Sequence, residues 1–143
     1  MKKRIILFTL LSGMLFGLNI ISAQNNPKIY AKFLEEPPMK SSINDLLDTN
    51  FKIEFKSKKQ VTIYLSLRKK NKPLANYIYT GKSKKPQILT GRLTQFKGMR
   101  IPPGKGYSYK LLIFEGEKND WSNKLGEVVV NNVAITSSFK KRR

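Results

Sequence analysis

The clearest pattern along the chain is the run from residue 107 to residue 114, in which large apolar side chains stand at every second position. The alternating side chains are Tyr107, Tyr109, Leu111 and Ile113. A period of two places such side chains on one face of a β-strand. The segment just before it, 101–106, holds two prolines and two glycines, which suit a tight approach loop. We therefore predict a central strand here, with its alternating side chains in a hydrophobic core.

Six other segments have a strand-like pattern, either alternating or rich in β-branched and aromatic residues. They are residues 28–34, 51–56, 61–67, 76–80, 88–96 and 127–136. The short polar stretch 57–59 predicts a hairpin between the second and third of them, and 81–86 predicts a later turn. One short helical stretch is expected at 41–48, behind a Ser N-cap. Seven short strands without a long helix predict an all-β fold, a seven-stranded antiparallel β-sandwich.

The residues that lead into the central strand match a known motif. Ile101, Pro103, Gly104 and Tyr107 have the residue types and spacing of a tyrosine corner. In this feature the chain resembles immunoglobulin-like and fibronectin type III domains, which implies an immunoglobulin-like sandwich whose Tyr107 hydroxyl bonds to upstream backbone. Residues 102–135 are also loosely similar to accessory modules of secreted bacterial polysaccharide-degrading enzymes. That similarity implies a sugar-related role.

The start of the chain has the pattern of a signal peptide for export. A basic start precedes an apolar stretch at 5–21, and the small residues Ser22 and Ala23 follow. We expect cleavage after Ala23, and an uncleaved membrane anchor is the alternative. The predicted parts are a signal peptide at 1–23, a domain at 24–136 and a basic tail at 137–143. The signal peptide predicts a periplasmic, secreted or cell-surface protein without stable membrane insertion after cleavage. Because the chain has no Cys, we expect that it is not a lipoprotein.

The composition excludes several kinds of chemistry. The chain has no Cys and no His, so it lacks a disulfide, a Ser-His-Asp triad, a thiol nucleophile and the usual zinc ligands. Its acidic residues, such as the adjacent Glu35 and Glu36, form no credible pair for glycoside hydrolysis. We expect no enzyme activity, no cofactor and no metal. The oxygen-bearing side chains in residues 115–120 leave calcium binding as a minor alternative.

The strongest compositional signal is charge, since 28 Lys and Arg against 9 Asp and Glu give a formal net charge of +19. If consecutive strands are antiparallel, alternate loops meet at one end of the sandwich. The basic residues expected there, around the single tryptophan Trp121, are Lys58, Lys59, Lys82, Lys84, Lys85, Lys118 and Lys124. Lysines can neutralise sulfate, carboxylate or phosphate while the indole stacks on a sugar face, so we expect an acidic polysaccharide or envelope polyanion as ligand. The alternative is a set of solvated loops whose charge serves solubility.

A second basic group is expected at the other end of the sandwich, without an aromatic platform. It comprises Arg68, Lys69, Lys70, Lys72, Lys97, Arg100, Lys105 and the tail residues 140–143. Nucleic acid would suit so much positive charge, but export argues against a nucleic-acid partner.

The outward face of the central strand provides an alternative function. With Tyr107 in the core, Leu112 and Phe114 point outward beside an outward-facing Tyr64 on the neighbouring strand. An exposed apolar strip of this kind would mark an interface with a protein partner and make the domain a structural or adaptor subunit. The other possibility is that residues 35–50 cover the strip.

Overall fold

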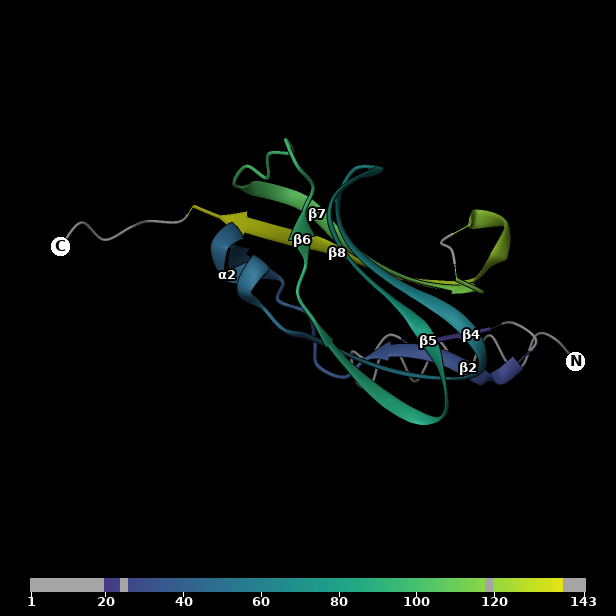
Figure 1. Cartoon of the computed structure of the whole chain (residues 1–143). Coiled ribbons are helices and arrows are strands. Elements are labelled where there is room, and N and C mark those ends of the chain that lie inside the picture. Colours follow the sequence, from purple (N-terminus) through teal and green to yellow (C-terminus); the bar gives the residue numbers. More distant parts are fainter. Residues whose placement is uncertain (1–19, 24–25, 118–119, 138–143) are drawn as a thin grey trace, which may run out of the picture.

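The computed structural model describes residues 20–23, 26–117 and 120–137, and Figure 1 shows them as a strongly curled β-sheet with one short helix. The strands are β1 (Ile20–Ala23), β2 (Asn26–Phe33), β3 (Lys40–Ser42), β4 (Phe51–Lys69), β5 (Lys72–Gly91), β6 (Thr94–Gln95), β7 (Gly104–Glu115) and β8 (Lys124–Thr136). Helix α2 (Ile43–Asp48) and the 3-10 turn η1 (Trp121–Asn123) are the helical elements of these ranges. The predicted all-β class is confirmed.

The described strands belong to one hydrogen-bonded sheet, in the order β1-β2-β4-β7-β8-β3, with β5 beside β4 and β6 beside β5. β3 runs parallel to β8 and the other pairs are antiparallel, so the sheet is mixed. The sheet is therefore not purely antiparallel, as the sequence predicts it to be, because β3 and β8 run parallel. The predicted strands are also not all separate: the first half of the single strand β4 lies between β2 and β5, and its second half lies between β7 and β5.

The predicted hairpin between residues 51–56 and 61–67 is wrong. The chain does not reverse at the polar residues between them, and both segments lie in the single strand β4. The reversal comes later, at the two-residue turn of Lys70 and Asn71 that joins β4 to β5. In the same way, the predicted turn at 81–86 lies inside β5. As a result, β4 and β5 form one long, bent hairpin (Figure 1).

A β-bulge explains how β4 continues through its polar middle. Ser57 pairs with Ser83, whereas Val61 pairs with Gly81, so β4 has extra residues at this point. The buried Ser57 hydroxyl accepts from the amide of Lys59 and donates to its carbonyl oxygen. The bulge takes up the polar residues and keeps the apolar positions on both sides of it facing the core.

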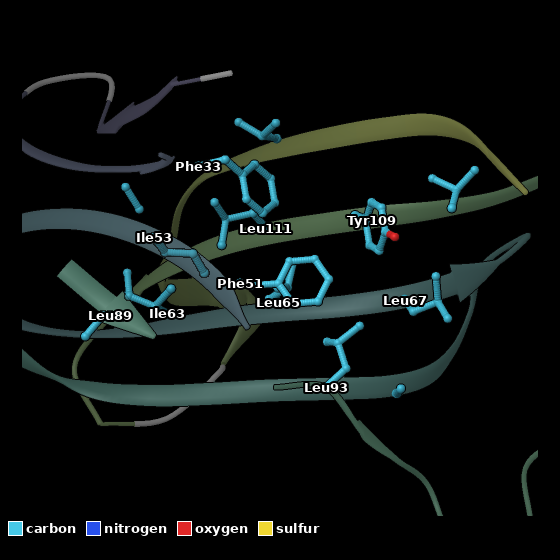
Figure 2. Close-up of a cluster of buried hydrophobic side chains, with 14 of the residues drawn as sticks. Phe33, Phe51, Ile53, Ile63, Leu65, Leu67, Leu89, Leu93, Tyr109 and Leu111 are labelled. Atoms are coloured by element: carbon cyan, nitrogen blue, oxygen red, sulfur yellow. The ribbon is translucent and has the colours of Figure 1, made fainter. Parts of the chain in front are cut away.

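The inner face of the curled sheet holds the main hydrophobic core (Figure 2). The four side chains predicted to point inward from β7 are all buried there. Phe51 of β4 lies edge-on to Tyr109 of β7, with ring centroids 5.6 Å apart. Burial raises the pKa of the Tyr109 hydroxyl, which donates a 2.6 Å hydrogen bond to the carbonyl oxygen of Pro38. The expected orientation of the central strand is confirmed.

The segment between β2 and β4 closes this core. Leu46 of α2 is fully buried in the main cluster, and two other apolar side chains of the helix pack against it. The helix begins after Ser42, whose Oγ accepts from the amide of Asp45 at 3.2 Å. The predicted short helix with a Ser cap is therefore confirmed, and it lies on the inner face.

The predicted signal peptide lies mostly outside the described residues, which begin at Ile20. Its last four residues, Ile20–Ala23, form β1 and pair antiparallel with β2. Cleavage after Ala23 stays a prediction. Within the described ranges, no helix is long and apolar enough to cross a membrane. Residues 138–143 of the predicted tail also lie outside the described part of the chain.

Candidate anion-binding surfaces

The side chain of Trp121 lies on the outer face of the sheet, in the connection between β7 and β8. Its indole meets the ring of Phe114 edge-on, with centroids 5.8 Å apart, and remains 55% exposed. Hydrogen bonds hold the start of this connection against β4: the amide of Gly116 donates to the carbonyl of Gln60 at 2.8 Å, and the hydroxyl of Thr62 donates to the carbonyl of Gly116 at 2.9 Å. Trp121 is therefore a half-exposed ring on an anchored loop.

Two lysines of this chain lie over the Trp121 ring. The Nζ atoms of Lys110 and Lys124 are 5.2 and 5.5 Å from its centroid, and they form ion pairs with Glu127 at 3.2 and 3.4 Å. Burial acts to raise the pKa of Glu127, but the hydrogen bonds and charges of the two lysines outweigh it and hold that pKa below its usual range. Lys124 is therefore partly neutralised and contributes less to an external anion site than the sequence predicts.

The predicted apolar strip on this face is present but is not exposed. Tyr64, Leu112 and Phe114 form a second, small cluster and are 8%, 0% and 1% exposed. Trp121 lies against Phe114 from the adjacent loop. The prediction of a free interface here is wrong. Residues 35–50 are not the cover either, because their apolar side chains pack against the main core on the inner face.

Four of the lysines predicted to surround Trp121 form an exposed group at the bend of the β4–β5 hairpin. They are Lys58, Lys82, Lys84 and Lys85, and we call them the lysine ridge. None of the four forms an ion pair with a carboxylate of the described residues. Of the other predicted lysines, Lys59 lies 3.5 Å from Glu115, and Lys118 lies outside the described residues. The ridge therefore keeps uncompensated positive charge on a surface that solvent reaches.

The outer face of β5 connects the lysine ridge to the Trp121 loop. The hydroxyl oxygens of Thr62 and Thr80 are 3.1 Å apart, and Thr62 also bonds to the loop at Gly116. Alternation along β5 places Lys82 after Thr80 on this same face. The start of the Trp121 loop is therefore tied to β5 at Thr80, two residues before Lys82. That the ridge lysines surround Trp121 stays a prediction.

The residues of the predicted tyrosine corner lie at the entry to β7. Tyr107 is 1% exposed, and its hydroxyl donates a 2.5 Å hydrogen bond to the carbonyl oxygen of Pro102, a bond to upstream backbone of the kind that the resemblance implies. Burial raises the pKa of this hydroxyl. Ile101 is buried and Pro103 is exposed, while Gly104 has a φ of 153° that a residue with a side chain rarely adopts.

A depression of about 350 Å³ lies beside Tyr107, at the end of β7 remote from Trp121. It is lined by Lys69, Lys70, Lys72, Leu74, Arg100, Pro102 and Tyr107, and we call it the basic pocket. The Nζ of Lys69 lies 4.8 Å from the centroid of the Tyr107 ring. The sequence signals the basic residues of this end but not their aromatic partner, because the pairing of Lys69 with Tyr107 is set by the register of β4 and β7.

The loop proposed as a minor calcium alternative does not assemble a metal site within the described residues. The oxygen-bearing side chains in question are those of Glu115, Glu117, Asn119 and Asp120. Asn119 lies outside the described residues, and Glu115 is paired with Lys59. Across the ranges that the structure describes, no three acidic side chains gather at a spacing suited to a metal ion.

The fold and these surfaces define an all-β domain with two basic regions, the lysine ridge at the bend of the β4–β5 hairpin and the basic pocket at Tyr107. No protein-family model matches the chain, and no relative is found among curated proteins. Its function is therefore inferred from the chemistry of its side chains.

Proposed function

We propose that this chain is an exported, non-catalytic β-domain that binds acidic glycans or other envelope polyanions through the lysine ridge. The observation that supports this function best is the group of four exposed lysines at one bend, without carboxylate partners among the described residues. Lysine ammonium groups on flexible stems act as point charges that follow sulfate, phosphate or carboxylate groups along a polymer. A surface of one sign also raises the local concentration of a charged polymer.

Trp121 has a supporting role in this proposal. Its ring is 55% exposed, which leaves apolar surface for the flat face of a sugar. Lys110 and Lys124, which Glu127 holds over the ring, occupy part of that surface. In this proposal the ridge provides most of the attraction, and Trp121 adds apolar contact area.

Export and an immunoglobulin-like fold are further parts of the proposal. The predicted signal peptide at 1–23 supports export. The hydrogen bond from Tyr107 to Pro102 supports an immunoglobulin-like ancestry for the β7 corner. The alternative role, an adaptor that docks through the β7 face, loses its basis because Tyr64, Leu112 and Phe114 are buried.

The test is retention on a heparin matrix, with neutral dextran as the reference polymer. We compare Lys82→Gln/Lys84→Gln/Lys85→Gln with a control of equal charge, Lys40→Gln/Lys97→Gln/Lys105→Gln. The exposed lysines of the control belong neither to the ridge nor to the lining of the basic pocket. The ridge variant should bind roughly tenfold more weakly, with a plot of log affinity against log salt less steep by about two, because each neutralised charge contributes about 0.7–0.9 to that slope. If both variants lose the same heparin affinity, net charge alone determines binding and the ridge is not a specific site. No retention of the unmodified protein at low salt would reject the function.

A further inference from the structure

The basic pocket combines a cationic rim with an apolar floor. Leu74 and Tyr107 are 6% and 1% exposed, and with Pro102 they give the depression a nonpolar base. The charged side chains around it are those of Lys69, Lys70, Lys72 and Arg100, and its lining contains no acidic residue. A concave site with an apolar base and a few converging polar groups is the usual form of a small-molecule site, and about 350 Å³ is at the small end of that class.

The charges at this pocket are arranged at a cost to stability. Lys69 and Lys72 are paired directly across the β4–β5 hairpin, where like charges destabilise a sheet. Neither these two lysines nor Arg100 forms an ion pair with a carboxylate of the described residues. An anion in the pocket would remove this repulsion.

The turn at the mouth of the pocket is also strained. Lys70 has a φ of 54°, in the left-handed region that is unfavourable for a residue with a side chain. Asn tolerates this region better than Lys, yet the neighbouring Asn71 is not the residue that adopts it. The residue with the strained backbone, Lys70, is therefore also one that lines the pocket. Strain of this kind gathers at functional sites.

One of the cations is already held in place. The Nζ of Lys69 lies 4.8 Å from the Tyr107 ring centroid, and the Tyr107 hydroxyl is fixed on Pro102. A cation on an aromatic face loses less conformational freedom when an anion arrives. The pocket is therefore partly organised before a ligand binds.

From these observations we propose that the basic pocket binds a small organic phosphate or sulfate ester. Lys69, Lys70, Lys72 and Arg100 take the anionic head, and the guanidinium of Arg100 can hold two of its oxygens. The short organic body lies against Leu74, Pro102 and Tyr107. This site is separate from the lysine ridge. The eight residue steps of β7 from Tyr107 to Glu115 span roughly 26 Å, and Glu115 lies opposite Val61, beside the bend that holds the ridge.

Calorimetric titration of the purified protein with phenyl phosphate tests this proposal, with phenyl sulfate, inorganic phosphate and phenol as comparison probes. Phenyl phosphate or phenyl sulfate should bind saturably at one site, about tenfold more tightly than inorganic phosphate because of the apolar floor, while phenol should not bind. The stronger of the two esters identifies the natural head group.

Single substitutions then test whether the esters bind in the basic pocket. Arg100→Gln should weaken ester binding about tenfold, whereas the ridge control Lys84→Gln should change it less than about twofold. Lys70→Gly keeps a left-handed turn residue without its charge, so it should weaken binding and raise the melting temperature together.

Three results would contradict ester binding in the basic pocket. They are no saturable binding of either ester, equal weakening of ester binding by Lys84→Gln and Arg100→Gln, or equal affinity for inorganic phosphate and the esters. Because heparin also carries sulfate groups, its retention should fall far less in Arg100→Gln than in the ridge variant. Failure of the pocket and failure of the polyanion function are therefore distinguished.

Discussion

The rings of Phe114 and Trp121 meet at an interplanar angle of 89°, with the first fully covered and the second half exposed. This difference predicts unequal effects of truncation. Phe114→Ala should lower the free energy of unfolding by about 3–5 kcal/mol, because it opens a cavity below the loop. Trp121→Ala should lower it by only about 1 kcal/mol, because its ring keeps much of its contact with water. Urea unfolding followed by circular dichroism measures both, and equal losses would show that Trp121 is a core residue.

Glu127 controls the surroundings of the single tryptophan through pH. Its pKa is held below the usual 4.5 by Lys110 and Lys124, so its contribution to stability is present above pH 4.5 and is lost as the pH falls through the lower, folded value. Protonation should release both lysines from Glu127 and change the emission of Trp121 in acid below pH 4.5. Glu127→Gln should abolish this transition. If Trp121 emission still changes in acid in Glu127→Gln, the transition comes from another titratable group.

Tyr107→Phe removes one hydroxyl at the entry to β7 and keeps the ring. The loss of the hydrogen bond to Pro102 should destabilise the fold by about 0.5–1.5 kcal/mol, as measured by thermal or urea unfolding. Binding in the basic pocket should persist, because Lys69 still lies over an aromatic ring. A variant that unfolds at room temperature would instead show that the corner is needed to form the sheet.

Gly91 at the end of β5 lies beneath the ring of Tyr77, and a side chain at this position would overlap that ring. Gly91→Ala should therefore cost about 1–3 kcal/mol through overpacking. The cost should fall in a Tyr77→Ala background, and this double-mutant cycle checks the cause. Gly98→Ala is the contrasting variant, because open space surrounds Gly98 and only its φ of 78° opposes a side chain. An unchanged cost in the double variant would point to the β5 backbone instead.

The sequence predicts the local features of this fold well, because they depend on neighbouring residues. The inward face of β7, the Ser42 cap and the bond from Tyr107 to upstream backbone all follow from short patterns. The continuity of β4 through residues 57–60, by contrast, does not follow from a short pattern. A polar run after a strand usually signals a turn, and only the pairing of Ser57 with Ser83 makes it a bulge.

The surfaces could be predicted only in part for the same physical reason. Charge and a lone Trp121 are visible in the sequence, and so is the lysine-rich turn. The burial of Leu112 and the meeting of Lys69 with Tyr107 depend on strand register and on where a loop returns, which a single sequence does not encode in any short pattern. The sequence therefore does not predict the basic pocket.

The parallel pairing of β3 with β8 joins an early segment of the chain to its last strand, with Lys40 opposite Ala134 and Ser42 opposite Thr136. The sheet cannot close until β8 has been delivered, and contacts so distant in sequence form slowly. A chain threaded through an export channel must stay extended until most of it has passed. In a protein exported as we propose, this dependence on β8 would keep the sheet open until β8 had passed the channel.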